Sequence, residues 1–552
     1  MMGTVRLGAR RAGGQDRARR PWRPVVPALA FAALLALGGC ATYLAESASF
    51  DPSRAERIFA EGYANIQEKY IDPVDIADLS YRGIRNLDEI DPTLDISATA
   101  TGLSIRGRDG TAREIPIPGG SDPNDWAQFT TRMVLTARAA SPVVHAADTE
   151  VIFEAVFNGA LLPLDHHSRY VGLRSARDSR AQREGFGGIG IRLNFEGDLP
   201  RIEAVQPDTP AAQSRLKEGD VITHIDGLPI DGLERHDVIW SLRGMEGTSV
   251  TLEVTREGQP LPIKETLQRT LIFPRTVEYE RKGPIALIRI TSFNQRTARD
   301  LEQMIVGLPR KEHPPLRGIV LDLRGNPGGL LDQAVAVADV FLRSGLILTT
   351  GGRHPESVQR FNATGRDLTD GMPLVVLING GSASAAEIVA SALQDRGRAV
   401  VVGTNSYGKG TVQNITRLPN DGELILTWSR FRAPSGYVLD ELGVFPNVCT
   451  ADLLALTPDN EIRARIRSMI GGAAVTLTLW RTLARLDHVR RKEIRKVCPN
   501  GADKPEVDLT VARKILEDRA LYARTLGMSS TRLATDKAAL PAPTQPLLRR
   551  SP

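Results

Sequence analysis

The chain has 552 residues, 41% of them hydrophobic and 24% charged, which is the composition of a globular protein with room for two or three domains. Its formal net charge is +5, but residues 1–39 contribute seven arginines and one aspartate, a net charge of +6, so the remainder carries −1. A basic surface of the kind that binds nucleic acid is therefore excluded for that remainder.

The first 39 residues have the pattern of an export signal. A basic stretch ending at Arg23 precedes an apolar stretch, Val25 to Leu37, that is shorter than a typical membrane span. Leu37-Gly-Gly-Cys40 then resembles a bacterial lipoprotein cleavage box, whose cysteine becomes lipidated and N-terminal. We therefore expect a lipoprotein signal peptide over 1–39, lipid on Cys40, and a periplasmic protein held to a membrane of the cell envelope. The alternative is a plain export signal with a stray cysteine.

Only two cysteines remain once Cys40 is assigned to the lipid. Cys449 and Cys498 form a natural pair in an oxidising compartment, but the sequence does not fix their Cα separation, so a disulfide between them stays a hypothesis. The chain has no CxxC and no HExxH sequence. The sequence therefore predicts no metal site and no cofactor.

Residues 40–175 form a mostly helical region with an insertion. Helical spacing of apolar residues ends before Asp72-Pro73, and a polar stretch rich in Gly and Pro follows. The sequence predicts helices over Arg54–Tyr70, Asp125–Ala140 and Asp148–Leu162, with a small hairpin around Arg108-Asp109-Gly110 inside the insertion 97–123. Residues 175–184 are highly charged and suggest a linker.

Residues 183–270 resemble a PDZ domain. The segment Gly185 to Gly190 fits GxGxxG, but a charged stretch precedes it and an alternating strand follows, so a dinucleotide site is rejected. Short strands, a helix over 235–243 and the loop Gly188-Ile189-Gly190-Ile191 occur in the order of a PDZ domain. We expect this loop to bind the carboxylate of a peptide C-terminus. The alternative is that these glycines only make tight turns in a small β domain.

An alternating α/β pattern follows from residue 271 to 450. Strands are predicted over 285–290, 318–322, 374–378, 399–403 and 424–431, and helices over 330–342 and 388–394. The C-terminal region, 451–527, predicts two helices, 463–497 and 508–526, and the polar residues 528–552 predict a disordered tail.

Residues 150–450 carry motifs, in order, that resemble those of the carboxy-terminal processing, or tail-specific, protease family. The motifs are Asn158-Gly…Leu164-Asp165…Ser168-Arg-Tyr170, Asp322-Leu-Arg324-Gly-Asn326-Pro-Gly328-Gly329, Ser382-Ala-Ser384-Ala-Ala-Glu387-Ile388, Gly408-Lys409-Gly-Thr-Val-Gln413 and Ala433-Pro434-Ser-Gly436. The resemblance implies a multidomain α+β protein with a crotonase-like protease core. It also implies that Ser384 is the nucleophile, Lys409 its base and Gln413 the third member of the site.

The chemistry agrees with this assignment. A serine needs an adjacent base, and a lysine serves only when neutral, so its pKa must fall from about 10.4 by roughly three units, a cost near 4 kcal/mol. Glutamine can bond the amine without adding a negative charge that would raise the pKa again. The N–H of Ala385, at a helix start, is expected to form the oxyanion hole with Gly328 or Gly329, while Ser382 is the rival nucleophile.

The sequence thus predicts a serine endopeptidase that recognises proteins by apolar C-terminal tails and cleaves them through an acyl-enzyme. Further expected partners are the membrane, through the lipid anchor, and a second copy or a regulatory protein. Two alternatives stay open. One is a catalytically silent PDZ scaffold at the cell envelope, and the other is acyl-CoA chemistry, because the family's core resembles the crotonase fold.

Overall fold

The computed structural model describes residues 50–108, 110–197, 199–309, 313–453, 458–500 and 505–528. The expected signal peptide, Cys40 and nearly all of the expected tail lie outside these residues. The description below concerns the unit that begins at Pro52. In the described part of the chain, none of the helices has both the length and the apolar character needed to cross a bilayer.

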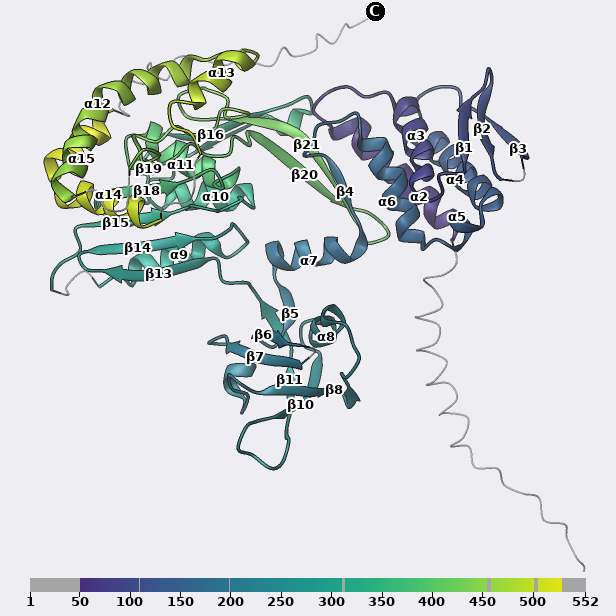
Figure 1. Ribbon diagram of the computed structural model, residues 1–552, viewed down its shortest axis with the longest axis horizontal. Helices are drawn as coiled ribbons and strands as arrows, with labels where there is room; N and C mark the ends of the chain where they lie inside the picture. Colours follow the sequence, from purple (N-terminus) through teal and green to yellow (C-terminus); the bar gives the residue numbers. More distant parts are fainter. Residues whose placement is uncertain are drawn as a thin grey trace, which may run out of the picture. The chain divides into compact units, whose positions relative to one another are not determined.

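The N-terminal region is a group of helices joined to a small sheet (Figure 1). Phe59 lies at its centre, with ring centroids 5.5 Å from Phe153 and 5.6 Å from Phe157. The insertion forms an antiparallel sheet in the order β1-β2-β3, which includes the expected hairpin. The elements are α2 (Pro52–Lys69), α3 (Ile76–Arg85), β1 (Asp95–Ala98), β2 (Gly102–Arg106), β3 (Ala112–Pro116), α4 (Pro123–Ala140), α5 (Pro142–Ala146) and α6 (Thr149–Leu161).

The charged stretch expected to be a linker is instead a helix, α7 (Leu173–Glu184). Three arginines spaced three residues apart lie on one side of it and pair with acids of the α/β region 271–450. Arg177 lies 3.1 Å from Asp421, and Glu423 accepts from both Arg180 and Arg183 at 3.0 and 2.7 Å. The linker prediction was wrong because charge alone does not distinguish a solvated linker from a helix whose charges are paired.

Residues 186–272 contain a small β domain. Its main sheet has the order β11-β10-β8-β7-β6 and packs on α8 (Arg235–Leu242). The core includes Ile202, Val238 and Leu252, and each is at most 1% exposed. The strands are β5 (Phe186–Gly188), β6 (Ile191–Glu196), β7 (Leu199–Val205), β8 (Val221–Ile225), β9 (Leu228–Pro229), β10 (Ser249–Thr255), β11 (Ile263–Gln268) and β12 (Thr270–Ile272).

The α/β region that follows is organised around a sheet with the order β13-β14-β15-β18-β19-β22. Its strands are parallel except for β13. Its strands are β13 (Val277–Lys282), β14 (Ile285–Ile290), β15 (Gly318–Asp322), β18 (Leu374–Ile378), β19 (Val400–Gly403) and β22 (Val448–Cys449). All five residues of β15 and all five of β18 are buried, as expected for a parallel sheet covered on both faces.

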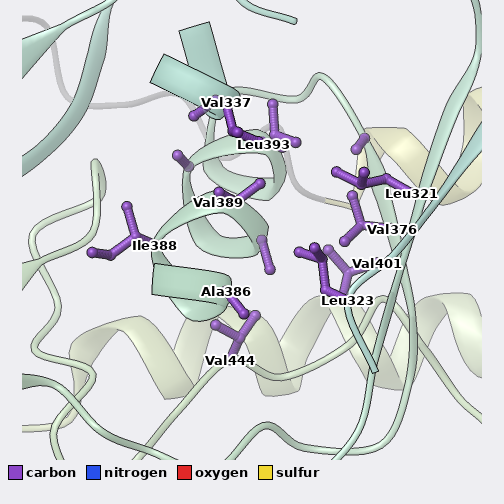
Figure 2. Packing of buried hydrophobic residues seen from close by; sticks show 14 of the residues in the cluster. Leu321, Leu323, Val337, Val376, Ala386, Ile388, Val389, Leu393, Val401 and Val444 are labelled. Atoms are coloured by element: carbon purple, nitrogen blue, oxygen red, sulfur yellow. The ribbon is translucent and has the colours of Figure 1, made fainter. Parts of the chain in front are cut away.

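Successive side chains of these strands belong to two separate hydrophobic clusters, one on each face of the sheet. One face packs on α9 (Thr297–Val306), α10 (Leu331–Asp339) and α11 (Ala385–Asp395). Figure 2 shows Val376 and Val401 of the sheet beside Val389 and Leu393 of α11. The other face packs on α12 (Asp459–Thr482), α14 (Pro505–Glu517) and α15 (Arg519–Gly527). All residues of α11 are buried, so the site that begins this helix has a rigid support.

A second sheet has the order β17-β16-β21-β20, and β4 also pairs with β21. These strands are β4 (Arg169–Val171), β16 (Leu346–Gly351), β17 (Gln359–Asn362), β20 (Thr411–Arg417) and β21 (Glu423–Arg432). Strand β4 comes from the end of the N-terminal region, so this sheet brings residues around 169 next to residues around 425.

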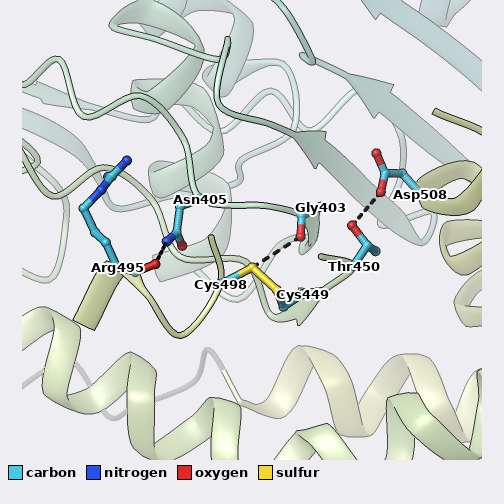
Figure 3. The surroundings of a disulfide bond; sticks show 7 residues. All are labelled: Gly403, Asn405, Cys449, Thr450, Arg495, Cys498 and Asp508. Atoms are coloured by element: carbon cyan, nitrogen blue, oxygen red, sulfur yellow. Dashed lines mark hydrogen bonds between the residues drawn. A yellow bond between two sulfur atoms is a disulfide. The ribbon is translucent and has the colours of Figure 1, made fainter. Parts of the chain in front are cut away.

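Each of the two long C-terminal helices expected from the sequence is divided in two. The first becomes α12 and α13 (His488–Arg495), where Asp487 caps α13 by accepting from the Arg490 N–H. The second becomes α14 and α15, where Asp518 caps α15. Apolar periodicity continues across such breaks, but an aspartate that bonds the next turn begins a new helix. Figure 3 shows Cys498, which follows α13, in a disulfide with Cys449 of β22; the sulfurs lie 2.02 Å apart and the Cα atoms 5.9 Å apart.

Candidate functional site

Ser384 lies at the turn between β18 and α11, in an unusual backbone conformation. Its φ is 54° and its ψ is −113°, a region that a non-glycine residue occupies at a cost of about 1–3 kcal/mol. The surrounding structure holds this turn, since the Ser384 N–H donates to Glu387 Oε2 at 2.8 Å. Such strained strand-to-helix turns are typical of exposed nucleophiles.

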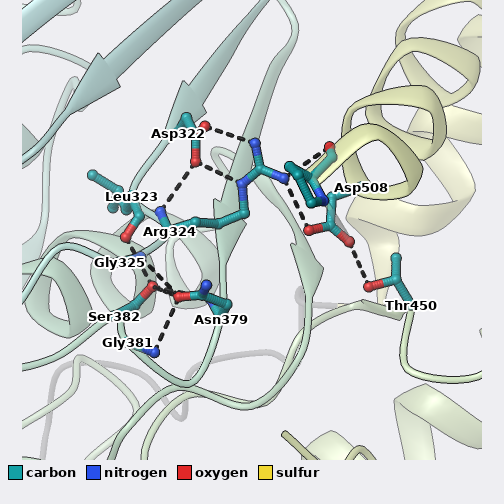
Figure 4. A network of polar contacts seen from close by, with 10 residues as sticks. Asp322, Leu323, Arg324, Gly325, Asn379, Gly381, Ser382, Thr450 and Asp508 are labelled. Carbon is teal, nitrogen blue, oxygen red and sulfur yellow. Dashed lines mark hydrogen bonds and ion pairs between the residues drawn. The ribbon is translucent and has the colours of Figure 1, made fainter. Parts of the chain in front are cut away.

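The hydroxyl of the rival serine, Ser382, is used in hydrogen bonds within the structure. It is fully buried, its hydroxyl donates to the carbonyl of Leu323 at 2.8 Å, and it accepts from the Asn379 N–H at 3.0 Å. Ser384, in contrast, lines a cavity. Figure 4 shows Ser382 among the bonds that hold the turn, where it supports the loop.

Lys409 lies in the loop between β19 and β20, and the glycines on each side permit this loop to pack closely. Gly408 has a φ of 98°, and a Cβ on Gly410 would lie only 2.0 Å from the Asp440 nitrogen. The Lys409 N–H donates to Glu387 Oε2 at 2.9 Å. The same carboxyl oxygen therefore holds the backbone of Ser384 and of Lys409.

Glu387 is the residue whose importance the sequence did not reveal. It is 0% exposed, and besides Ser384 and Lys409 it accepts from the Gly408 N–H at 2.7 Å and from the Ser406 hydroxyl. Burial raises its pKa, while these hydrogen bonds favour the carboxylate. The signal available in the sequence was a glutamate three residues into a helix, at the position of a capping box.

The surroundings of Lys409 lower its pKa. Burial is the largest cause and the positive charge of Arg169 adds to it, whereas the carboxyls of Glu387 and Asp165 oppose the shift. His167 lies in the same electrostatic environment: burial and then Lys409 lower its pKa to about 4. The site thus shifts both basic side chains toward their neutral forms, and a pKa of about 4 leaves His167 neutral near pH 7.

Gln413, on β20, is held by threonines. Its side-chain nitrogen donates to Thr411 Oγ1 at 2.8 Å and to Thr427 Oγ1 at 3.2 Å. Thr427 in turn donates to Asp165 Oδ1 at 2.9 Å. Among the described residues Gln413 makes no hydrogen bond to Lys409, although both line the same cavity.

The two glycines proposed for the oxyanion hole differ in what their N–H groups do. Gly328 donates to Asn326 Oδ1 at 2.8 Å, and a Cβ on Gly328 would lie 2.8 Å from that of Ser384. Gly329 and Ala385 both line the cavity beside Ser384, and within the described part of the chain neither N–H donates to a protein acceptor. Gly329 is therefore the glycine with a free donor, and Gly328 allows the close approach of the two loops.

These residues enclose a cavity of about 240 Å³. Residues far apart in the sequence line it, and they fall into three groups. The residues with hydrogen-bonding side chains or backbone groups are Ser384, Ala385, Gly329, Thr411, Gln413 and Ser179. The basic side chains are Lys409, Arg169 and Arg183. The apolar or ring surface comes from Pro327, Leu331, Ile388, Val412, Ile415, Ile425 and Phe431. The arrangement has the parts that acyl transfer needs: a nucleophile, a base and free N–H donors.

The small β domain has a second cavity, of about 230 Å³. It is lined by the four residues expected to bind a carboxylate, Gly188, Ile189, Gly190 and Ile191, and by Phe186, Arg192, Leu193, Ile239, Leu242 and Arg243. Arg243 pairs with Asp178 of α7 at 2.8 Å and its guanidinium lies 4.5 Å from the centre of the Phe186 ring. In the described residues no three His, Cys, Asp or Glu side chains gather as a metal site would require.

Known protein families match the two regions of the chain that contain these cavities. The family model for peptidase family S41 matches residues 284–450, and that for the PDZ domain matches residues 187–266. The carboxy-terminal-processing protease of Bartonella bacilliformis is 40% identical over 334 residues, which are 60% of this chain and 77% of that protein. A probable CtpA-like serine protease of Staphylococcus aureus is 33% identical over 307 residues, which are 54% of this chain and 60% of that protein. The alignment with the solved structure of a photosystem II D1 C-terminal processing protease covers 71% of this chain and 92% of the solved chain, with 21% sequence identity and a TM-score of 0.37.

Proposed function

Because the chain belongs to the carboxy-terminal-processing proteases of peptidase family S41, and is therefore a serine protease, we propose that Ser384 is its nucleophile and Lys409 its general base. The observation that carries this proposal is the buried carboxyl of Glu387, which bonds the backbone of both residues and so fixes them at one cavity.

In the proposed reaction, neutral Lys409 takes the proton of the Ser384 hydroxyl as its oxygen attacks the peptide carbonyl. The N–H groups of Gly329 and Ala385 bind the oxygen of the tetrahedral intermediate. The lysine ammonium then gives its proton to the leaving amine, which leaves an acyl-enzyme on Ser384. Water, deprotonated by the same lysine, hydrolyses this ester and restores the enzyme.

Gln413 is proposed to orient Lys409. With its nitrogen bonded to Thr411 and Thr427, its side-chain oxygen is left to accept a hydrogen from the amine. Because the amide is neutral, it orients the lysine without stabilising the ammonium as a carboxylate would.

Substrate selection is proposed to use both cavities. The apolar lining at Leu331, Ile388 and Phe431 favours an apolar residue beside the cleaved bond. The PDZ cavity combines the Gly188–Ile191 loop with Ile239 and Leu242, which suits an apolar C-terminal residue and its carboxylate. We therefore propose protein substrates that end in apolar tails.

The cellular location is likewise a proposal. Leu37-Gly-Gly-Cys40 favours a lipid anchor on Cys40 in the periplasm, and a disulfide between Cys449 and Cys498 is consistent with an oxidising compartment. Labelling with a radioactive fatty acid tests the anchor: wild type should incorporate label, and Cys40→Ala should not.

One assay tests the reaction. Wild type, Ser384→Ala and Lys409→Ala are incubated with an unfolded protein that ends in an apolar residue, and products are identified by mass spectrometry. We expect cleavage by wild type alone and tail binding by all three. Tail binding without cleavage by any of them would favour a PDZ scaffold, and cleavage by Ser384→Ala would refute the proposed nucleophile.

A further inference from the structure

A short segment of the C-terminal region, residues 495–500, contacts two loops of the catalytic site, the one that contains Lys409 and the one that leads to Ser384. Asn405, four residues before Lys409, donates from its amide to the Arg495 carbonyl at 2.7 Å (Figure 3). The Arg495 guanidinium donates to the Ser406 carbonyl at 2.9 Å and to the Leu442 carbonyl. On the other loop, a Cβ on Gly380 would lie 2.9 Å from the Asn500 side chain. The segment thus contacts the loop of Lys409 and the loop that leads to Ser384.

Arg495 is connected to the catalytic pair through very few bonds. It holds the carbonyl of Ser406, and the hydroxyl of the same serine donates to the Glu387 carboxyl that bonds Ser384 and Lys409. Burial lowers the pKa of Arg495, and the Glu387 carboxyl opposes that shift, which is a further sign that the two charges are close. A movement of Arg495 therefore changes the support of Glu387 and of the Lys409 loop.

The disulfide fixes this segment to the core. Cys498 is 0% exposed, its N–H donates to the Arg495 carbonyl at 3.4 Å, and its sulfur bonds Cys449 at the end of β22. The residue after Cys449, Thr450, donates to Asp508, which pairs with Arg324 at 3.0 Å. Figure 4 shows this connection reaching the loop that begins at Asp322. The loop that begins at Asp322 therefore also meets the C-terminal region, as do the loop of Lys409 and the loop that leads to Ser384.

We propose that residues 495–500 are a positioning clamp for the Lys409 loop, with Arg495 as the positioning residue, and that the Cys449–Cys498 disulfide is required for full catalytic rate. This inference rests on the proposed roles of Ser384 and Lys409. A dithiol reductant supplies two electrons and two protons, so the S–S bond becomes two thiols and the reductant becomes a disulfide. Reduction releases the clamp, and oxidation restores it.

The test compares Arg495→Met, Arg495→Lys and the double variant Cys449→Ala/Cys498→Ala with wild type. Arg490→Met is the matched control, because Arg490 is an exposed arginine of the same helix that pairs with Asp487. For each, kcat and KM are measured on a short peptide ester, and labelling of Ser384 by a fluorophosphonate is timed. All assays run well below the unfolding temperature of the least stable variant.

We expect Arg495→Met to lower kcat and the labelling rate by about 10- to 100-fold, because small misplacements of catalytic groups have effects of that size. The double cysteine variant, and wild type reduced with dithiothreitol, should lose about 10-fold, and reoxidised wild type should recover. KM and tail binding should stay within about twofold, Arg490→Met should match wild type, and Arg495→Lys should recover part of the rate.

If the variants unfold at lower temperature but keep the wild-type kcat and labelling rate, the clamp only stabilises the fold and the proposal is wrong. That outcome leaves the proposed function intact, since Ser384→Ala and Lys409→Ala would still be inactive. If instead Ser384→Ala keeps activity, the proposed function fails whatever Arg495 does.

Discussion

The cavity that Ser384 and Lys409 line, the catalytic cavity, has a volume of about 240 Å³, and the cavity of the PDZ domain, the PDZ cavity, has a similar volume of about 230 Å³. The two are formed by different arrangements of the chain. The PDZ cavity is formed by two short stretches, 186–193 and 239–243, and most of its lining is apolar or glycine. The catalytic cavity takes residues from 169 to 431 and brings three basic side chains beside Ser384. Its parts meet because a buried glutamate and a buried asparagine tie separate loops together.

The difference indicates what each region is sensitive to. A cavity made of contiguous residues needs only its local fold, so changes in its lining should affect binding. A cavity made of converging loops depends on buried polar groups that contact no substrate, so changes in those groups should affect kcat. Substitutions matched between the two regions can separate these expectations.

The largest effect is expected from Ser384→Ala, which should lower kcat by about 10³-fold or more because no acyl-enzyme can form. Ser382→Ala is the matched control. It should retain most of kcat but lose about 1–3 kcal/mol of unfolding free energy, since the Ser382 hydroxyl bonds loop backbone and the Asn379 side chain. Steady-state kinetics measures kcat, and chemical denaturation measures the unfolding free energy. An inactive Ser382→Ala beside an active Ser384→Ala would reverse the assignment.

Glu387→Gln should have the next largest effect. One of its two oxygens becomes an NH₂ group facing N–H donors, so we expect kcat to fall by about 10- to 100-fold and stability by roughly 3 kcal/mol. Asp220→Asn is the control in the PDZ domain, where the fully buried Asp220 pairs with Arg256 at 2.7 Å. It should destabilise its domain while leaving kcat on a short peptide unchanged. Equal losses of kcat in Glu387→Gln and Asp220→Asn would contradict the proposed difference between the two regions.

In the PDZ cavity, Ile191→Glu should raise KM about tenfold for a protein substrate with an apolar tail, because it places a charge where the tail binds. kcat on a short peptide without the tail should not change. Leu228→Glu, at a residue of the same domain that is 71% exposed, should match wild type in both assays. If Ile191→Glu instead lowers kcat on the short peptide, the two cavities do not have separate roles.

The smallest expected effect is a shift of pH dependence in Gln413→Glu. A carboxylate near Lys409 stabilises the ammonium, so the folded-state pKa of the lysine should rise and the rising limb of activity should move up by about one pH unit. Thr416→Glu, at a half-buried residue of the same strand that does not line the cavity, should leave the limb in place. An unmoved limb in Gln413→Glu would argue against a contact between Gln413 and Lys409.

The sequence predicted most of the fold, because the core strands carry strong local signals. Mostly apolar runs such as 285–290, 318–322 and 374–378 are strands with the predicted bounds. Failures arose where local patterns are ambiguous. Paired arginines made α7 a helix, and the aspartates Asp487 and Asp518 divided the C-terminal helices.

The sequence motifs of the site were predictable, but the contacts that join its loops were not. Short motifs marked Ser384, Lys409 and Gln413, and the structure brings all three to one cavity. Glu387 stands 22 residues before Lys409, and nothing in that spacing reveals that one carboxyl bonds both loops. Arg169 and Arg495 contribute through tertiary contacts that no local pattern encodes. Likewise, only the fold shows that Asn326 accepts the N–H of Gly328, whereas the N–H of Gly329 has no acceptor among the described residues.

The pH dependence of kcat/KM tests the central claim, that a neutral Lys409 activates Ser384, most directly. Burial and Arg169 lower the Lys409 pKa, so the fraction of neutral lysine rises at a lower pH than it does for an ordinary lysine, whose pKa is about 10.4. For cleavage that Ser384→Ala abolishes, we expect kcat/KM to rise from pH 5 toward a plateau at neutral or mildly alkaline pH, tenfold per unit on its acid side. A profile that is flat from pH 5 to 9 would contradict the role of Lys409 as the base.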